Sequence, residues 1–243
     1  MNEALQVMSA PRLVVALDVP HAARAVTLVE QLTPLNVLFK IGYEAFYGYA
    51  DTIREALAAH GAQYALDLKL DDIPRTVHAA VRNVVRPGVR LLTVHALGGA
   101  QMLEAAVDAA RERAAELDMP VPDIYAVTIL TSISSEDLGE LGLIGGLGEN
   151  VTRLAALARD ARCAGVVCSV REVADLRLFF GSEFGTFCPG IRPAGSAHGD
   201  QKRAATPREA REAGADFAVV GRPIVDDADP VNAARAILAE LAG

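Results

Sequence analysis

The chain has 243 residues, of which 51% are hydrophobic, and its formal net charge at pH 7 is -8. That length supports a sizeable core, and although it would accommodate two domains, α/β barrels often reach this size as one domain. The negative charge argues against a nucleic-acid partner, and no apolar stretch approaches the length of a membrane span. We therefore expect a globular protein that binds neither nucleic acid nor membrane.

Short β-like segments alternate with longer helical segments from one end of the chain to the other. The helical patterns include residues 101–117 and 150–161. Such alternation predicts βαβ units and a parallel sheet, and eight units predict one closed (β/α)8 TIM barrel over residues 1–243. An open doubly wound sheet is the alternative. The candidate strands cover residues 13–19, 37–42, 63–69, 91–96, 124–130, 165–169, 185–190 and 217–221.

Helix boundary signals late in the chain agree with this pattern. Thr206 and Glu209 have the spacing of a capping box, with Pro207 at the first helical position. Gly214 stands where a left-handed glycine commonly ends a helix. Asp229 followed by proline marks the start of the last helix in the same way.

Polar residues occupy the ends of the first four candidate strands. Side chains alternate between the two faces of a strand, and the face that carries Asp18, Lys40, Asp67, Lys69 and His95 turns polar at the C-terminal end of each strand. One such residue would more often be solvated at a strand-to-loop transition. Five on successive strands with consistent alternation favour a shared cavity at the C-terminal end of the barrel, where barrel enzymes build their active sites.

The mixed charge of this group has a chemical meaning. A lysine beside several carboxylates keeps its proton, because opposite charges favour the ammonium form, and it is then a candidate proton donor. Neighbouring carboxylates repel each other unless a lysine bridges them, and that repulsion can also act on an anionic substrate.

The second half of the chain offers an anion site. Residues 188–207, after the seventh strand, are rich in Gly, Pro, Ser and Ala and predict a lid around residues 190–204 that carries Arg192 and Gln201. After the eighth strand, Gly221 permits close approach of a ligand to the backbone, and Arg222 offers a fork of donors. Loops after these two strands often bind phosphate in barrels, although Gly-Arg alone is also typical of an ordinary turn.

No motif predicts a metal or a redox centre. His21, His60, His78 and His198 lack metal-ligand spacing, so we expect surface or hydrogen-bonded roles for them. The cysteines Cys163, Cys168 and Cys188 show no C-x-x-C spacing and leave an odd count. The first residues, "MNEALQVMSAPR", do not resemble a signal peptide, so we expect reduced cysteines in a cytoplasmic protein.

Several motifs together resemble one known family over almost the whole chain. "DLKLDDIP", residues 67–74, is similar to the D-x-K-x-x-D-I-P signature of the orotidine 5'-phosphate decarboxylases. "VVALDVP", "FKIG", "TVHALGG" and "TILTS" resemble the first, second, fourth and fifth strand regions of that family. "CPGIRP", "GDQKR" and "VVGRPI" resemble its phosphate-end motifs. The D-x-K-x-x-D element is shared with sister enzymes, but the full ordered set is specific.

The resemblance implies a reaction and a charge network. The activity would be decarboxylation of orotidine 5'-phosphate to UMP in pyrimidine biosynthesis, without metal or cofactor. Lys69 would protonate C6 of the pyrimidine, Asp67 would lie beside the leaving carboxylate, and Lys40 would join the network. Asp72 and Ile73 would reach the site from the partner subunit of a homodimer, where Ile73 would line the pyrimidine pocket.

The resemblance also implies a set of substrate contacts. Asp18 and Lys40 would bind ribose hydroxyls, Thr76 would contact the ligand across the dimer interface, and Thr131 would bind the edge of the base. The phosphate would be held, and the lid closed, by Arg192, Gln201, Gly221 and Arg222. His95 would lie near the site as a supporting residue. Asp71 and Arg75 depart from the family pattern, but neither belongs to the charged network.

Two other functions remain as alternatives. Sister enzymes such as 3-keto-gulonate 6-phosphate decarboxylase hold Mg²⁺ and have a carboxylate where this chain has Lys40. An ammonium is a poor magnesium ligand, so Lys40 argues against them. A catalytically silent protein that binds nucleotide phosphates is the second alternative, and the complete Asp67, Lys69 and Asp72 set argues against it.

Overall fold

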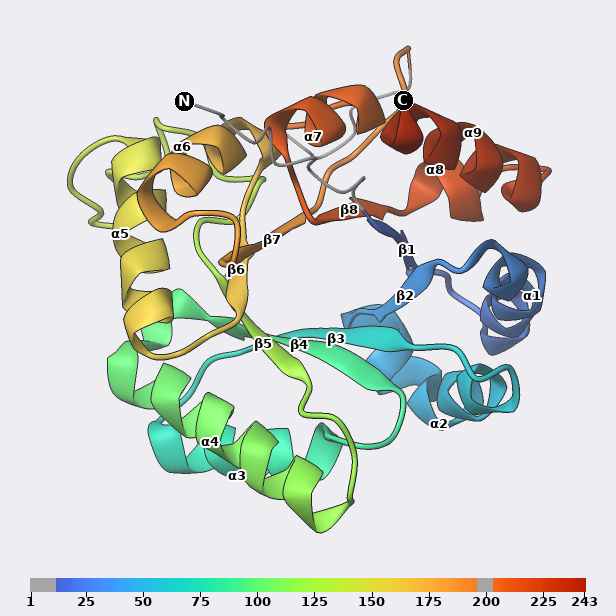
Figure 1. Cartoon of the computed structure of the whole chain (residues 1–243), viewed down its shortest axis with the longest axis horizontal. Helices are drawn as coiled ribbons and strands as arrows, with labels where there is room; N and C mark the ends of the chain where they lie inside the picture. Colours follow the sequence, from blue (N-terminus) through green and yellow to red (C-terminus); the bar gives the residue numbers. More distant parts are fainter. Residues whose placement is uncertain (1–11, 196–202) are drawn as a thin grey trace, which may run out of the picture.

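The computed structural model describes residues 12–195 and 203–243. Its strands form a closed barrel in the order β1 to β8, and every neighbouring pair is parallel. Figure 1 views this ring of strands with the helices arranged around its outside. The strands are β1 (Arg12–Ala16), β2 (Leu38–Ile41), β3 (Tyr64–Leu70), β4 (Val89–His95), β5 (Asp123–Val127), β6 (Gly165–Val167), β7 (Gly185–Cys188) and β8 (Phe217–Val220).

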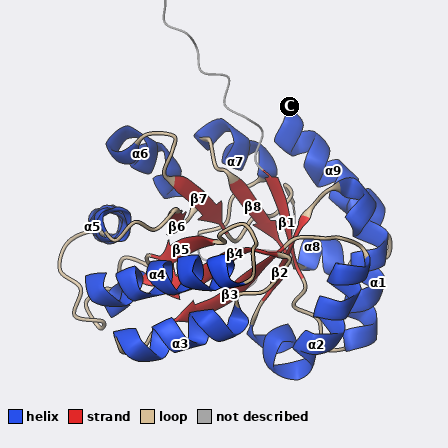
Figure 2. Ribbon diagram, turned by 60° about the horizontal axis from the view of Figure 1, so that its bottom comes forward, coloured by secondary structure: helices blue, strands red, loops and turns tan. Residues whose placement is uncertain are grey.

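Helices follow the strands and cover the outer face of the barrel (Figure 2). Short 3₁₀ helices lie at Thr33–Leu35 and Ala96–Gly98. The α-helices are α1 (Ala22–Leu32), α2 (Tyr43–Ala59), α3 (Pro74–Val84), α4 (Ala100–Glu116), α5 (Leu147–Asp160), α6 (Val170–Phe180), α7 (Pro207–Ala213), α8 (Arg222–Val225) and α9 (Pro230–Ala242).

The predicted TIM barrel is confirmed, and pairing of the first and last strands excludes the open sheet. Val14 of β1 lies opposite Val219 of β8, which closes the ring. Each predicted strand corresponds to an observed one, but several end earlier than predicted. β1 stops at Ala16 and β5 at Val127, because the chain there leaves the strand ladder to form the loops at the C-terminal end of the barrel.

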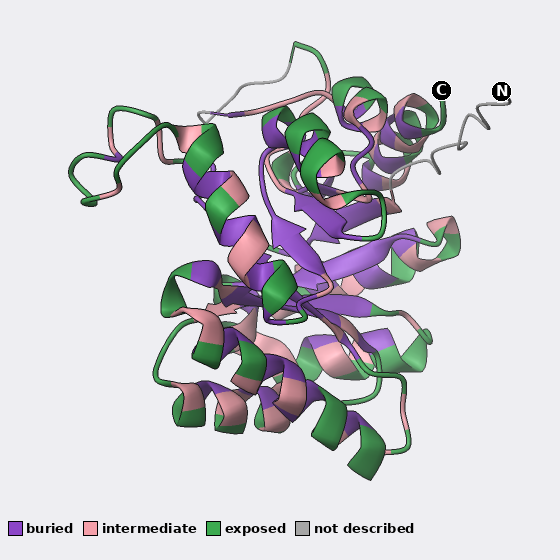
Figure 3. Cartoon of the chain, turned by 60° about the vertical axis from the view of Figure 1, so that its left-hand side comes forward, coloured by how far each residue is buried: buried purple, intermediate pink, exposed green. Residues whose placement is uncertain are grey.

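The core has two layers. Inside the barrel, a smaller cluster includes Val14, Leu38, Ala65 and Phe187, and a larger cluster lies between the strands and the surrounding helices. Figure 3 shows buried strands at the centre and helices whose outward faces are exposed. Alternation along each strand therefore sends one set of side chains into the barrel and the other toward the helices, as predicted.

The predicted helix boundaries in the last third of the chain are confirmed. Thr206 caps α7 through its hydroxyl, which accepts from the Glu209 amide, while the Glu209 carboxylate accepts from the Thr206 amide. Gly214 ends α7 with a left-handed φ of 81°. The Asp229 side chain caps α9 by accepting from the Asn232 amide. Within the described ranges, no helix is both long and apolar enough to cross a membrane.

Candidate active site

A cavity of about 520 Å³ opens at the C-terminal ends of the strands. Its volume falls within the range of roughly 300–1,000 Å³ that is typical of small-molecule sites. Apolar side chains from inside the barrel, such as Val127, Val167 and Phe187, form part of its wall. The structure brings eight of the predicted site residues to this cavity: Asp18, Lys40, Asp67, Lys69, Thr131, Arg192, Gly221 and Arg222.

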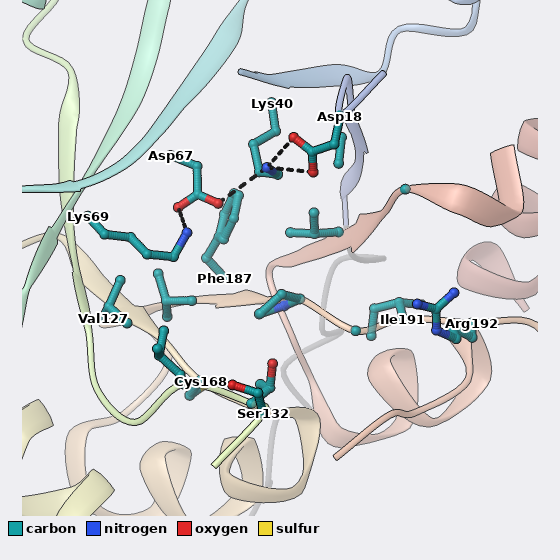
Figure 4. Close-up of a pocket in the computed structure, with 18 of the residues that line it drawn as sticks. Asp18, Lys40, Asp67, Lys69, Val127, Ser132, Cys168, Phe187, Ile191 and Arg192 are labelled. Carbon is teal, nitrogen blue, oxygen red and sulfur yellow. Dashed lines mark hydrogen bonds and ion pairs between the residues drawn. The ribbon is translucent and has the colours of Figure 1, made fainter. Parts of the chain in front are cut away.

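Four of these residues form a chain of alternating charges (Figure 4). Lys40 Nζ lies 3.2 Å from Asp18 Oδ2 and 3.3 Å from Asp67 Oδ2. The other oxygen of Asp67, Oδ1, lies 2.8 Å from Lys69 Nζ. Each carboxylate in this chain therefore contacts an ammonium, and the two negative and two positive charges balance.

Burial varies along this chain of charges. The side chains of Lys40 and Asp67 are 8% and 11% exposed, whereas those of Asp18 and Lys69 are 46% and 27% exposed. Lys40 and Asp67 extend from β2 and β3 into the barrel, Lys69 lies near the end of β3, and Asp18 follows β1. The middle of the chain is thus removed from water, and Lys69 remains accessible to a ligand.

The electrostatics of the buried pair favour charged forms. Burial opposes the charge of Lys40, but the carboxylates of Asp67 and Asp18 outweigh it, and the pKa of Lys40 is raised. Burial likewise opposes ionisation of Asp67, yet the ammonium groups of Lys40 and Lys69 and a hydrogen bond from Thr93 lower its pKa. The arrangement keeps Asp67 ionised and Lys40 protonated around neutral pH.

Lys69 has an unusual backbone conformation. Its φ is 45°, in the left-handed region, which costs a non-glycine residue about 1–2 kcal/mol. The ladder between β3 and β4 is irregular at the same place: Leu66 lies opposite Leu92, and Leu70 lies opposite Val94. Simple alternation predicted that Lys69 would point inward like Asp67. The side chain does reach the cavity, but from an irregular strand end rather than from a regular one.

Two residues that sequence reasoning did not single out support the chain of charges. Thr93 of β4 is fully buried, and its hydroxyl donates to Asp67 Oδ1 at 2.9 Å. Gly42 follows β2, and a Cβ there would lie 2.6 Å from Asp18 Oδ1 and 2.8 Å from Lys40 Nζ. In the sequence, Gly42 is the last residue of "FKIG", and Thr93 lies two residues before His95. Neither has a motif of its own that would mark it as a site residue.

The loops after β7 and β8 carry cationic groups on the cavity wall. Arg192 lies on the opposite side of the cavity from Lys69 (Figure 4), and Arg222 begins α8. A Cβ on Gly221 would meet Ala16 Cβ at 3.6 Å, an ordinary contact, so protein packing alone does not require glycine there. Gln201 and much of the predicted lid around residues 190–204 lie outside the described residues.

Arg203 links the loops around the cavity. Its guanidinium is buried and contacts Glu172 Oε1 at 2.6 Å, and it donates to the carbonyl groups of Ile129 and Leu130 at 2.8 and 3.0 Å. Burial raises the pKa of Glu172, against the opposing effect of Arg203. The loop after β5, which continues to Thr131, is thereby tied to the start of α6 and to the chain that enters α7.

Asp72, Ile73 and Thr76 do not line this cavity. All three are exposed where β3 passes into α3, and Asp72 Oδ1 accepts from the Ile73 amide at 2.7 Å. Ile73 is 62% exposed, unusual for an isoleucine. His95 also lies outside the cavity wall, and burial lowers its pKa. Over residues 12–195 and 203–243, no group of three or more His, Cys, Asp or Glu side chains is arranged to hold a metal.

Comparison with known proteins gives consistent matches over the full length. The model of the "Orotidine 5'-phosphate decarboxylase / HUMPS family" matches residues 11–237. Orotidine 5'-phosphate decarboxylase of Moorella thermoacetica is 46% identical over 242 residues, which cover 99% of this chain and 96% of that protein. The protein of the same name from Paramagnetospirillum magneticum is 48% identical over 227 residues, which cover 93% of this chain and 97% of that protein.

A solved structure extends this similarity to three dimensions. The crystal structure of orotidine 5'-phosphate decarboxylase from Lactobacillus acidophilus matches with a TM-score of 0.82 at 36% identity. The match covers 97% of this chain and all of that one.

Proposed function

This chain belongs to the orotidine 5'-phosphate decarboxylase / HUMPS family, and from that premise we propose that it converts orotidine 5'-phosphate to UMP and CO₂ without a metal or cofactor. The observation that carries the proposal is the charge chain Asp18–Lys40–Asp67–Lys69 at the C-terminal end of the barrel. It presents one accessible ammonium, Lys69, to a cavity whose far side carries Arg192 (Figure 4).

Lys69 has the central chemical role in this proposal. The bond between C6 of the pyrimidine and its carboxylate breaks, CO₂ leaves, and the electron pair stays on C6. The ring does not delocalise that pair well, so the nearby positive charge of Lys69 stabilises it as it forms. Lys69 Nζ then donates a proton to C6, which gives UMP, and the resulting amine regains its proton from solvent.

Asp67 and Lys40 hold this ammonium in place. Asp67 Oδ1 binds Lys69 Nζ while Oδ2 faces Lys40, so neither oxygen lacks a cation. Asp67 would stand beside the carboxylate that leaves, and Asp18 with Lys40 would bind the ribose hydroxyls. Enzymes lower barriers by about 8–23 kcal/mol, and one ion pair does not supply the upper part of that range. The remainder requires binding energy from parts of the substrate away from C6.

The phosphate end of the substrate supplies that remote binding in our proposal. Arg192, Gly221 and Arg222, from the loops after β7 and β8, would hold the phosphate, and Thr131 would bind the base edge. Guanidinium groups recognise phosphate oxygens through paired hydrogen bonds. Lys69 and Arg192 lie on opposite sides of the cavity, which suits a ligand with a carboxylate-bearing pyrimidine at one end and a phosphate at the other.

We propose a homodimer in which Asp72, Ile73 and Thr76 serve the partner's site. In support, all three are exposed and none faces the cavity of its own chain. Exposed apolar side chains follow three neighbouring strands at this end of the barrel: Tyr43 after β2, Ile73 after β3 and Leu97 after β4. Such a surface is typical of a subunit interface.

A metal-dependent sister reaction is the main alternative. Lys40 argues against it, because its ammonium lies between Asp18 and Asp67 and a magnesium ion would have to replace it there. Decarboxylation that persists in excess EDTA would support our proposal. Decarboxylation that EDTA abolishes and Mg²⁺ restores would favour the alternative.

The decisive experiment is an absorbance assay that follows loss of orotidine 5'-phosphate in the wild-type protein and in Lys69→Ala. We expect turnover in the wild type and none measurable in the variant, which should keep its circular dichroism spectrum and its oligomeric state. A wild-type protein that binds UMP but does not turn over the substrate would favour the silent binding protein. Turnover in Lys69→Ala at the wild-type rate would overturn the role of this lysine.

A further inference from the structure

Thr93 lies on β4 opposite the irregular part of β3. The ladder pairs Leu66 with Leu92 and Leu70 with Val94, so the three residues from Asp67 to Lys69 face Thr93 alone on β4. Thr93 is fully buried and does not line the cavity, so it has no direct access to a substrate. Its hydroxyl is nevertheless within hydrogen-bond distance of two groups on β3.

The directions of these two hydrogen bonds are fixed by chemistry. The Lys69 amide can only donate, so Thr93 Oγ1 accepts from it at 2.9 Å. The hydroxyl proton is then free to point at Asp67 Oδ1, also at 2.9 Å. That same oxygen accepts from Lys69 Nζ at 2.8 Å. These hydrogen bonds form one closed ring, which runs from the Lys69 amide through the Thr93 hydroxyl and the Asp67 carboxylate to the Lys69 ammonium.

This ring explains how Lys69 tolerates its backbone conformation. In a regular strand, the amide of residue 69 would bond to a carbonyl of the neighbouring strand, but the left-handed φ of 45° removes it from the ladder. An amide left without a partner in this setting is unfavourable, and the Thr93 hydroxyl supplies the acceptor. The same hydroxyl orients the carboxylate to which the Lys69 side chain binds.

We propose that Thr93 is a positioning residue for the decarboxylation, and this inference rests on the proposed function. The Thr93 hydroxyl fixes the backbone of Lys69 through the hydrogen bond from the Lys69 amide. The same hydroxyl orients Asp67, which in turn fixes the position of the Lys69 ammonium. Losing the hydroxyl would leave Lys69 charged and present but displaced from the point where C6 must be protonated. Since a misplacement of about 1 Å can lower a rate about 100-fold, the effect should fall on kcat.

A purely structural role for Thr93 makes a different prediction. Thr186 provides the matched control, because it is also fully buried and its hydroxyl also donates to a carboxylate, Asp216 Oδ2 at 3.0 Å, and accepts from a backbone amide, that of Asp216. Thr186 lies on β7 and is not among the residues that line the cavity. Any loss common to Thr93→Val and Thr186→Val therefore reports on stability alone.

The test compares Thr93→Val, Thr93→Ser and Thr186→Val for kcat, KM and melting temperature. We expect kcat to fall about 10- to 100-fold in Thr93→Val with KM within about threefold, and Thr93→Ser to recover most of the loss because it keeps the hydroxyl. Thr186→Val should melt earlier and keep kcat within about twofold. A Thr93→Val protein that melts earlier but keeps wild-type kcat would overturn the proposal. If that variant does not fold, Thr93→Ala carries the same expectation and the same refutation.

A second measurement does not depend on turnover. The chain contains only three lysines, Lys40, Lys69 and Lys202, so lysine-selective isotope labelling gives very few side-chain NMR signals. Lys69→Ala identifies the Lys69 signal. We expect Thr93→Val to shift that signal and Thr186→Val to leave it in place. An unshifted Lys69 signal in Thr93→Val would refute the positioning role, whereas a shifted signal in a protein without decarboxylase activity would leave the positioning intact and refute only the proposed function.

Discussion

Adding a single methyl group at Gly42 should displace the charge chain. Its φ of -94° and ψ of -171° lie in the extended region, which alanine also adopts without strain. The atoms that a new Cβ would meet are Asp18 Oδ1 at 2.6 Å and Lys40 Nζ at 2.8 Å. Both are the far ends of flexible side chains, so the backbone need not move, but the charged groups must.

The size of the displacement follows from these distances. Ordinary contacts begin near 3.4 Å, so Asp18 Oδ1 would retreat by about 0.8 Å and Lys40 Nζ by about 0.6 Å. Shifts approaching 1 Å in a catalytic array can cost about 100-fold, so kcat/KM of Gly42→Ala should fall about 10- to 100-fold. The free energy of unfolding should change by less than about 1 kcal/mol, because the loss of a glycine N-cap is offset by lower entropy of the unfolded chain.

The assay measures kcat/KM by loss of substrate absorbance and stability by urea unfolding. Gly48→Ala is the matched control, since it adds a methyl group to the same helix where no atom lies within 4 Å. It should keep wild-type kcat/KM. If Gly42→Ala retained wild-type kcat/KM, the close approach of Asp18 and Lys40 to this glycine would not matter for turnover, and the reasoning would fail.

Two further predictions concern stability. Because the folded protein lowers the pKa of Asp67, its ionisation stabilises the fold above the ordinary pKa of 3.8, and that contribution disappears as pH falls through the lowered value. The stability difference between wild type and Asp67→Asn should therefore shrink on acidification below about pH 4 in urea titrations, and a difference independent of pH would contradict the lowered pKa. Arg203→Met should reduce the free energy of unfolding by about 3–5 kcal/mol, because it leaves the Glu172 carboxylate buried without its cation. Adding Glu172→Gln should recover part of that loss in the same urea assay, and a single variant as stable as wild type would rule out the buried ion pair as a stabilising link.

The sequence predicted the barrel and the inward charges because both depend on local patterns. Strand alternation placed Lys40 and Asp67 inside the barrel, and the spacing from Thr206 to Glu209 located the start of α7. These features require only the period of a strand or the geometry of a helix end. Such local features do not depend on contacts with distant parts of the chain, so the sequence pattern alone predicts them.

The remaining features depend on contacts between distant segments. The hydrogen bond from Arg203 to the Ile129 carbonyl joins residues that are 74 positions apart in the sequence. The steric role of Gly42 depends on side chains from β2 and from the loop after β1. The left-handed conformation of Lys69 contradicts its own strand-like sequence and is explained only by the facing residue, Thr93. The homodimer and the roles of Asp72, Ile73 and Thr76 stay predictions, since they concern a second chain.

The burial pattern of the charge chain also determines how the protein would respond to amine-directed chemistry. The described part of the chain carries its lysines only in the cavity, where Lys40 is buried between two carboxylates and Lys69 is partly open. Acylating and glycating reagents act on accessible amines, and of these two lysines Lys69 is the more accessible, with 27% of its side chain exposed against 8% for Lys40. Within residues 12–195 and 203–243, such modification would therefore fall on Lys69 rather than on Lys40, and labelling of Lys69 would block the proposed protonation.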